Sequence, residues 1–171
     1  MTKEAIRKFG LSLGADTVGF AAIEDYQAGN CPDPQSILPG VRSIVVLGYR
    51  EINGAVESDN ARVGLASRLG SLELSFKNNY VMCRFIEDTF NAKAVPIPFS
   101  YPLNYEMEGL VRGQWVTGDI SLRHAAVAAG LGVFGRHNLV IHPHFGTRII
   151  FAAVLNDLPL SSDPQITEEY C

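Results

Sequence analysis

The sequence predicts a single α+β domain in which one β-sheet is flanked by helices. Its 171 residues suit one domain, and 47% of them are hydrophobic, which is enough to build a substantial core. Segments with the apolar spacing of helices alternate along the chain with short β-branched runs typical of strands, and no internal repeat is present.

The first 50 residues predict a helix followed by two strands. Thr2 is a suitable N-cap, and Gly14 ends a helix whose apolar residues recur at helical spacing. These residues are Ile6, Phe9 and Leu13. Residues 15–22 then predict a strand, and the unbroken apolar run at residues 43–48 predicts a second, buried strand.

The central and final parts predict one long helix and two further strands. The helix is expected from about Arg62, and its apolar stripe is expected to pack on the core. The stripe consists of Leu65, Leu69, Leu72, Phe76, Tyr80, Cys83, Ile86 and Phe90. Pro96 restricts the strand at residues 94–97 to an edge or a terminus of the sheet. Residues 148–155 are the most hydrophobic strand candidate, and residues 98–118 predict a long loop.

Charge and cysteine content narrow the class of protein. Fourteen basic and eighteen acidic residues give a net charge of −4, and the basic residues are scattered, so no strong nucleic-acid footprint is present. A charged N-terminus and the lack of a membrane-length apolar run predict a cytoplasmic protein that does not contact a membrane. Three widely spaced cysteines, Cys31, Cys83 and Cys171, fit a reducing compartment better than a disulfide framework.

A glycine-rich segment at residues 129–138 contains the spacing G-x-G-x-x-G, at Gly130, Gly132 and Gly135. Dinucleotide-binding loops with this spacing follow a strand and precede a helix. Here the order is reversed, because an Ala-rich helix capped by Ser121 precedes the glycines and a short strand at residues 139–142 follows them. We therefore expect a helix C-cap and a tight turn instead of a dinucleotide site.

All four histidines fall in the same third of the chain, which is where we expect function. They are His124, His137, His142 and His144, accompanied by Arg123, Arg136 and Arg148. A zinc site at His142 and His144 is disfavoured, because Pro143 separates them and no carboxylate or cysteine is adjacent. Capping or surface roles are expected for these two histidines instead.

Residues 118–148 resemble the core of the epoxyqueuosine reductase and reductive dehalogenase superfamily. The family block AGLG-x-x-G-[KR]-x-x-L-x-x-x-P-x-x-G matches Ala129–Arg136 and then Leu139, Pro143 and Gly146. Residues 13–20, 37–46 and 155–160 also look like segments of that family. The resemblance therefore spans nearly the whole chain.

The resemblance implies a nitroreductase-like fold over residues 1–165 that binds cobalamin. It also implies that residues 166–171 begin a ferredoxin-like module with two 4Fe–4S clusters, absent from this sequence, with Cys171 as a first cluster ligand. One thiolate cannot hold such a cluster. A ferredoxin or flavodoxin electron donor and a small-molecule or modified-nucleoside substrate are the implied partners.

The family also implies which residues of this chain form the cofactor site. Gly130, Gly132 and Gly135 would let a flat corrin ring approach the backbone, while Arg136, His137 and Asn138 would meet its peripheral amides or phosphate. The alternative is that these glycines only pack the helix end against the sheet.

Three residues are candidate proton donors. Asp119 lies near the acidic donor of epoxyqueuosine reductases, although it is alternatively a helix N-cap. Tyr101 and Tyr105 would cover the ring and donate a proton as dehalogenase tyrosines do, or would pack the loop on the sheet.

Two functional hypotheses follow. In the first, the chain is the corrinoid-binding part of an iron–sulfur-dependent oxidoreductase. In the second, it is a non-catalytic domain that binds a corrinoid or a flavin such as FMN, because the same fold serves flavoenzymes.

Overall fold

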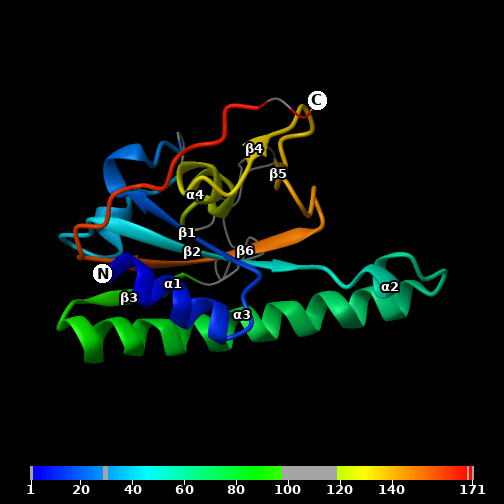
Figure 1. The fold of residues 1–171 in the computed structure, drawn as a ribbon, viewed down its shortest axis with the longest axis horizontal. Coiled ribbons are helices and arrows are strands. Elements are labelled where there is room, and N and C mark those ends of the chain that lie inside the picture. Colours follow the sequence, from blue (N-terminus) through cyan, green and yellow to red (C-terminus); the bar gives the residue numbers. More distant parts are fainter. Residues whose placement is uncertain (1, 29–30, 98–118, 169, 171) are drawn as a thin grey trace, which may run out of the picture.

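A computed structural model describes residues 2–28, 31–97, 119–168 and 170. These residues form three layers, with a four-stranded sheet between one layer of two helices and a second layer of one helix and a hairpin (Figure 1). The predicted α+β class is confirmed.

The sheet is antiparallel throughout, and its last strand lies inside it. The strands are β1 (Thr17–Ala22), β2 (Ser43–Arg50), β3 (Ala94–Ile97) and β6 (Ile149–Asn156), in the order β1-β2-β6-β3. Every residue of β6 is buried, as its uninterrupted apolar sequence predicts. β3 is an edge strand, which agrees with the position of Pro96.

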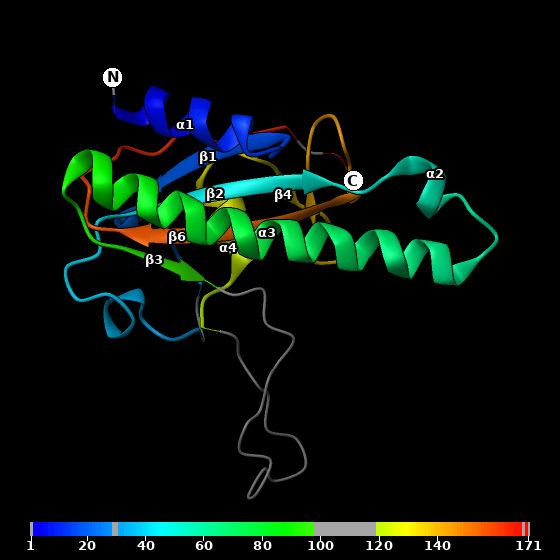
Figure 2. The same cartoon turned by 90° about the horizontal axis from the view of Figure 1, so that it is seen from below.

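The first helical layer contains α1 (Thr2–Ser12) and α3 (Ala61–Phe90), and the short α2 (Asn53–Val56) precedes α3. α1 ends before Gly14, whose φ of +93° is the left-handed conformation that a glycine C-cap adopts. Figure 2 shows α1 and α3 on the same face of the sheet. Ile6, Met82 and Ile86 are fully buried there between the helices and β1, β2 and β6.

The predicted apolar stripe of α3 is only partly correct. Leu72, Cys83 and Ile86 are buried, whereas Leu65, Leu69, Phe76 and Tyr80 are exposed. The buried face instead includes Asn78 and Asn79, whose amides donate hydrogen bonds to backbone carbonyls. The carbonyl groups of Leu13 and Ile97 face this side of α3 and need hydrogen-bond donors when buried. Asparagines therefore stand at positions where apolar residues were expected.

The second layer contains α4 (Leu122–Ala128) and a hairpin of β4 (Val133–Phe134) and β5 (Val140–Ile141). The alanines of α4 allow close packing on the sheet, and Ala125 and Ala126 are fully buried against strand residues such as Val46. No helix among the described segments is long and apolar enough to cross a membrane.

Candidate functional site

The glycine-rich segment begins where α4 ends. Gly130 has a φ of +68°, and the Leu131 N–H donates to the carbonyl of Ala126 at 2.9 Å, which closes the helix end. β4 and β5 follow the glycines, so a helix precedes them and strands follow, as predicted. The context excludes the dinucleotide-binding arrangement, which requires a strand before the loop and a helix after it.

At each of the three glycines, other atoms of the protein occupy the space that a side chain would need. A Cβ at Gly130 would lie 2.3 Å from the carbonyl oxygen of Pro164, and one at Gly132 would lie 2.6 Å from that of Ile141. At Gly135 it would lie 2.6 Å from the ring of His137, an exposed side chain that can move. Internal packing against backbone therefore accounts for Gly130 and Gly132, which supports the packing alternative for these two. Contact with a cofactor stays a prediction for the surface beside them.

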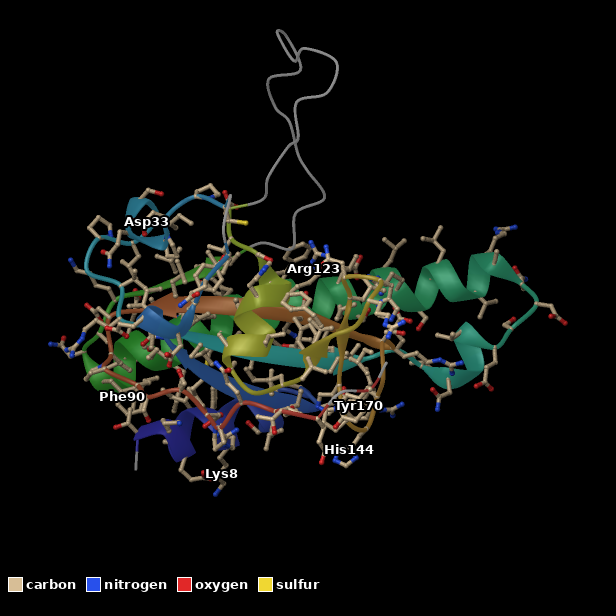
Figure 3. All side chains as sticks on the ribbon, turned by 90° about the horizontal axis from the view of Figure 1, so that it is seen from above. Lys8, Asp33, Phe90, Arg123, His144 and Tyr170 are labelled. Atoms are coloured by element: carbon tan, nitrogen blue, oxygen red, sulfur yellow. The ribbon has the colours of Figure 1, made fainter. Side chains whose placement is uncertain are left out.

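That surface is the hairpin tip, residues 136–139, all of which are exposed. Asn138 adopts a left-handed conformation with a φ of +61°, and its carbonyl accepts a hydrogen bond from the guanidinium of Arg123 on α4. The Nδ1 atom of His137 accepts from the Leu139 N–H at 3.1 Å. Figure 3 shows Arg123 well apart from His144. The tip thus exposes Arg136, and the guanidinium of Arg123 lies against its backbone at Asn138. Guanidinium groups are donors suited to amides or a phosphate.

The start of α4 carries a second polar cluster. Ser121 is the N-cap, because its Oγ accepts from the His124 N–H, and Asp119 is exposed two residues earlier. The alternative that Asp119 caps the helix is therefore wrong, although its catalytic role is still a prediction. The ring of His124 lies 4.8 Å from that of Phe134 on β4, which joins this cluster to the hairpin.

Tyr26 belongs to this cluster, and the sequence analysis missed it. Its hydroxyl accepts from the Ser121 N–H at 2.8 Å. Burial raises the pKa of Tyr26 to about 12, against the opposing effect of the Ser121 hydrogen bond, and Cys31 beside it adds to the increase. The phenol is thus protonated at neutral pH. Because 95 residues separate Tyr26 from Ser121, no local pattern could have identified it.

His142 and His144 lie at the turn that follows β5. The buried Nδ1 of His142 accepts from the backbone N–H groups of His144 and Phe145, at 3.1 and 3.4 Å. His142 therefore caps this turn, one of the two roles expected for it. Within the described ranges, no group of three or more potential metal ligands gathers anywhere.

We expect His142 to make the folded state pH-sensitive. Burial and then the nearby His144 lower the pKa of His142 below its ordinary value of 6.5. The unfolded chain therefore binds the proton first, and the free energy of unfolding falls as the pH drops below 6.5. Urea titrations between pH 7.5 and 5.5 measure this slope. His142→Asn keeps an acceptor for the turn and should flatten the slope, whereas an unchanged slope would contradict the assignment.

A pocket of about 450 Å³ opens beside this turn. It is lined by Arg50, Glu51, Asn53, His144, Phe145 and Arg148. Arg50 pairs with Asp16 and Arg148 pairs with Glu57, so acidic partners offset both guanidinium charges. The structure thus divides the predicted cluster, with Arg123, His124 and the hairpin tip in one group and His144 and Arg148 in another.

A C-terminal segment, residues 161–164, crosses the glycine-rich segment and is held by α1. The carboxylate of Asp163 accepts from Lys3 at 2.7 Å and from Arg7 at 2.9 Å, and its backbone N–H donates to the Phe20 carbonyl. Beyond this segment, Tyr170 lies on the same side of the molecule as His144 (Figure 3). Sequence analysis did not assign any role to these residues.

Three predicted site residues, Tyr101, Tyr105 and Cys171, lie outside the described residues, and their roles stay predictions. Cys83 is buried in the core, as expected for a small apolar residue, and burial raises the pKa of its thiol to about 12.

The fold and the site together define an α+β domain of three layers with a polar hairpin tip that contacts α4. No protein-family model matches the chain. It is 22% identical over 193 residues to the epoxyqueuosine reductase of Bacillus cereus, covering 98% of this chain and 48% of that protein. The chain therefore spans about half the length of the curated relative it matches.

Solved structures show the same fold. An epoxyqueuosine reductase from Bacillus subtilis, with its catalytic aspartate loop swung out of the active site, matches with a TM-score of 0.67 and 14% identity over 99% of this chain and 49% of its own. A reductive dehalogenase for which B12-dependent dehalogenation has been suggested matches with a TM-score of 0.63 and 20% identity over 95% and 22%. The chain thus shares the fold of epoxyqueuosine reductases and reductive dehalogenases, and the resemblance found in the sequence is confirmed.

Proposed function

We propose that residues 1–165 form the corrinoid-binding part of an iron–sulfur-dependent reductase related to epoxyqueuosine reductase. One observation carries this proposal: the fold match includes 95–99% of the chain in both epoxyqueuosine reductase and a protein described as B12-dependent. A domain that shares its fold with these proteins over almost its whole length is suited to the same class of ligand. The inference is one of analogy, so the residues must be tested for fit.

The donor groups of the hairpin tip fit the periphery of a corrinoid, whereas the glycines do not form an open cradle for its ring. A corrinoid carries amide side chains and a nucleotide phosphate. Arg136 and Arg123 supply guanidinium donors, and Asn138 supplies an amide that both donates and accepts. The exposed rim of Phe134 provides apolar surface beside them. When bound, a corrinoid supplies a cobalt centre for reductive chemistry.

The cluster at the start of α4 would hold or deliver a proton in such an enzyme. Asp119 is exposed and belongs to the segment that leads into α4, where its carboxyl group is accessible to a substrate. Tyr101 and Tyr105 remain candidate donors. The protonated hydroxyl of Tyr26, hydrogen-bonded to the helix start, fixes the position of this segment.

We further propose that the parent protein continues into a ferredoxin-like module with two 4Fe–4S clusters. The chain covers about half of the epoxyqueuosine reductases it matches. Ferredoxin or flavodoxin would supply electrons, and the substrate would be a small molecule or a modified nucleoside.

Titration of cob(II)alamin into the purified chain, followed by ultraviolet–visible spectroscopy, tests the proposal. We expect binding with a Kd of tens of micromolar or tighter, about −6 kcal/mol. The double variant Arg123→Ala/Arg136→Ala should weaken it about tenfold or more, because two charge-assisted contacts are lost. Lys8→Ala on α1 is the matched control and should bind as wild type.

A parallel titration with FMN separates the alternatives. Binding of FMN without binding of cob(II)alamin would favour the flavin hypothesis, and binding of neither would reject a cofactor role for this chain. Iron and acid-labile sulfide in a longer gene product, purified without oxygen, test the second module independently. A continuation without grouped cysteines would contradict that module and leave the cofactor result standing.

A further inference from the structure

The outer face of α3 carries a concentration of exposed apolar side chains. Of the twelve large hydrophobic side chains that the described residues expose, eight lie between residues 52 and 80. Four of them form the α3 stripe: Leu65, Leu69, Phe76 and Tyr80, which are 60%, 50%, 45% and 60% exposed. At 100° per residue they fall within an arc of roughly 60° on one side of the helix.

This stripe borders the face that α3 buries in the domain, and the buried Leu72 and Cys83 lie at the boundary between the two. The buried residues Ser75, Asn79, Met82 and Ile86 contact the sheet side, and the stripe lies next to them on the helix surface. Figure 2 views the molecule from the side of α3, which lies in front of the sheet. The exposed fractions of the four side chains show that no other described segment covers them. The carboxyl end lies on the α4 side of the sheet, so a segment following it would start on the opposite face (Figure 1).

We propose that the α3 stripe is a dimer interface in which α3 packs antiparallel against α3 of a second copy of this chain. The four side chains expose on the order of 500 Å² of mostly apolar surface, close to the apolar part of the roughly 800 Å² that each partner buries in a standard interface. Exposed apolar patches of this size are often functional sites. A symmetric pairing covers the whole stripe of both copies at once.

The positions of the side chains suit a two-fold axis near the level of Ser75. About this axis, Leu69 of one copy meets Tyr80 of the other, and Glu73 meets Lys77. Opposite charges thus flank the apolar contacts, as they do between packed helices.

Sedimentation velocity of the 171-residue chain, from about 1 to 100 µM, tests this interface. We expect a dimer whose Kd rises about tenfold or more in Leu69→Lys/Phe76→Lys, because two central apolar contacts are replaced by charges that repel across the axis. Leu11→Lys on α1, where Leu11 is 46% exposed, is the matched control and should leave the Kd unchanged. Circular dichroism checks that each variant folds.

A charge reversal tests the antiparallel register. Glu73→Lys and Lys77→Glu should each weaken the dimer, and the double reversal should restore it because every copy then carries both changes. Three results would overturn the proposal: a monomer throughout the concentration range, a dimer insensitive to the stripe variants, or a monomer that floats with phosphatidylglycerol vesicles and so uses the stripe on a membrane.

Discussion

Gly130→Ala is expected to destabilise the domain by about 3 kcal/mol. Two costs combine at this position. The φ of +68° is unfavourable for alanine by about 1–2 kcal/mol, and the added Cβ would lie 2.3 Å from the Pro164 carbonyl oxygen. The backbone of the C-terminal segment would have to move, which would disturb the contacts of Asp163. Urea unfolding followed by circular dichroism measures the change.

Substitutions at two other glycines measure the cost of a positive φ and the cost of a close Cβ contact separately. Gly146 has a φ of +58° but no atom within 4 Å of its Cβ position, so Gly146→Ala should cost only about 1 kcal/mol. Gly132 carries no positive φ, but its Cβ would lie 2.6 Å from the Ile141 carbonyl oxygen, so Gly132→Ala should cost about 2 kcal/mol. If Gly130→Ala costs no more than Gly146→Ala, the C-terminal segment does not lie against Gly130 in solution.

Asp163→Ala is expected to cost about 2 kcal/mol and to release the C-terminal segment from α1. The substitution removes an ion pair from each of two cations, Lys3 and Arg7, and it removes an acceptor for the Phe20 N–H at 3.2 Å. Arg7 keeps its more distant pair with Glu4. Asp163 is only 17% exposed at its side chain, so water replaces these contacts incompletely. Protection of the Phe20 amide from hydrogen exchange, together with urea unfolding, reports both effects.

Asp88→Ala provides the matched control. Asp88 pairs with Arg84 on the exposed side of α3 at 3.8 Å, and loss of this surface pair should cost less than about 0.5 kcal/mol. The Asp163 and Gly130 substitutions should also be less than additive, because both disturb the same crossing. Full additivity would show that the two residues act independently and would contradict the crossing as described.

The pH dependence of the Asp163 contribution follows from its environment. Burial alone would raise the pKa of this carboxyl, but hydrogen bonds and charges from Lys3 and Arg7 outweigh burial and hold the pKa below its ordinary value of 3.8. Its contribution is therefore present above pH 3.8 and is lost as the pH falls through the folded-state value. The stability difference between wild type and Asp163→Ala should shrink in that acidic range.

Local signals in the sequence were sufficient to predict most elements of the fold. Gly14 and Ser121 mark helix boundaries through backbone conformation and capping, and Pro96 identifies an edge strand because it lacks an N–H. The Ala-rich run before the glycines and the β-branched run after them predicted a helix before the turn and a strand after it. Each of these features depends on neighbours within a few residues, which a sequence shows directly.

Features that depend on remote partners could not be predicted in this way. Asp163 lies 156 residues from Arg7, and Asn79 donates to a carbonyl 74 residues away on β6. Their polar character gave no indication that the fold would bury them. The glycines were associated with a ligand because the segments that pack on them, including Pro164, could be identified only in three dimensions.

The central position of β6 determines when the domain can fold during synthesis. β6 pairs with β2 on one side and β3 on the other, and its contacts join residues as far apart as Ser43 and Asn156. A nascent chain that has reached only β3 therefore holds β1 and β2 as a two-stranded pair, with a gap where the middle strand belongs. Such a pair is marginally stable in water. The apolar faces of β1, β2 and α3 thus stay unprotected until residue 156 has emerged from the ribosome, and the chain is most prone to aggregation during that interval.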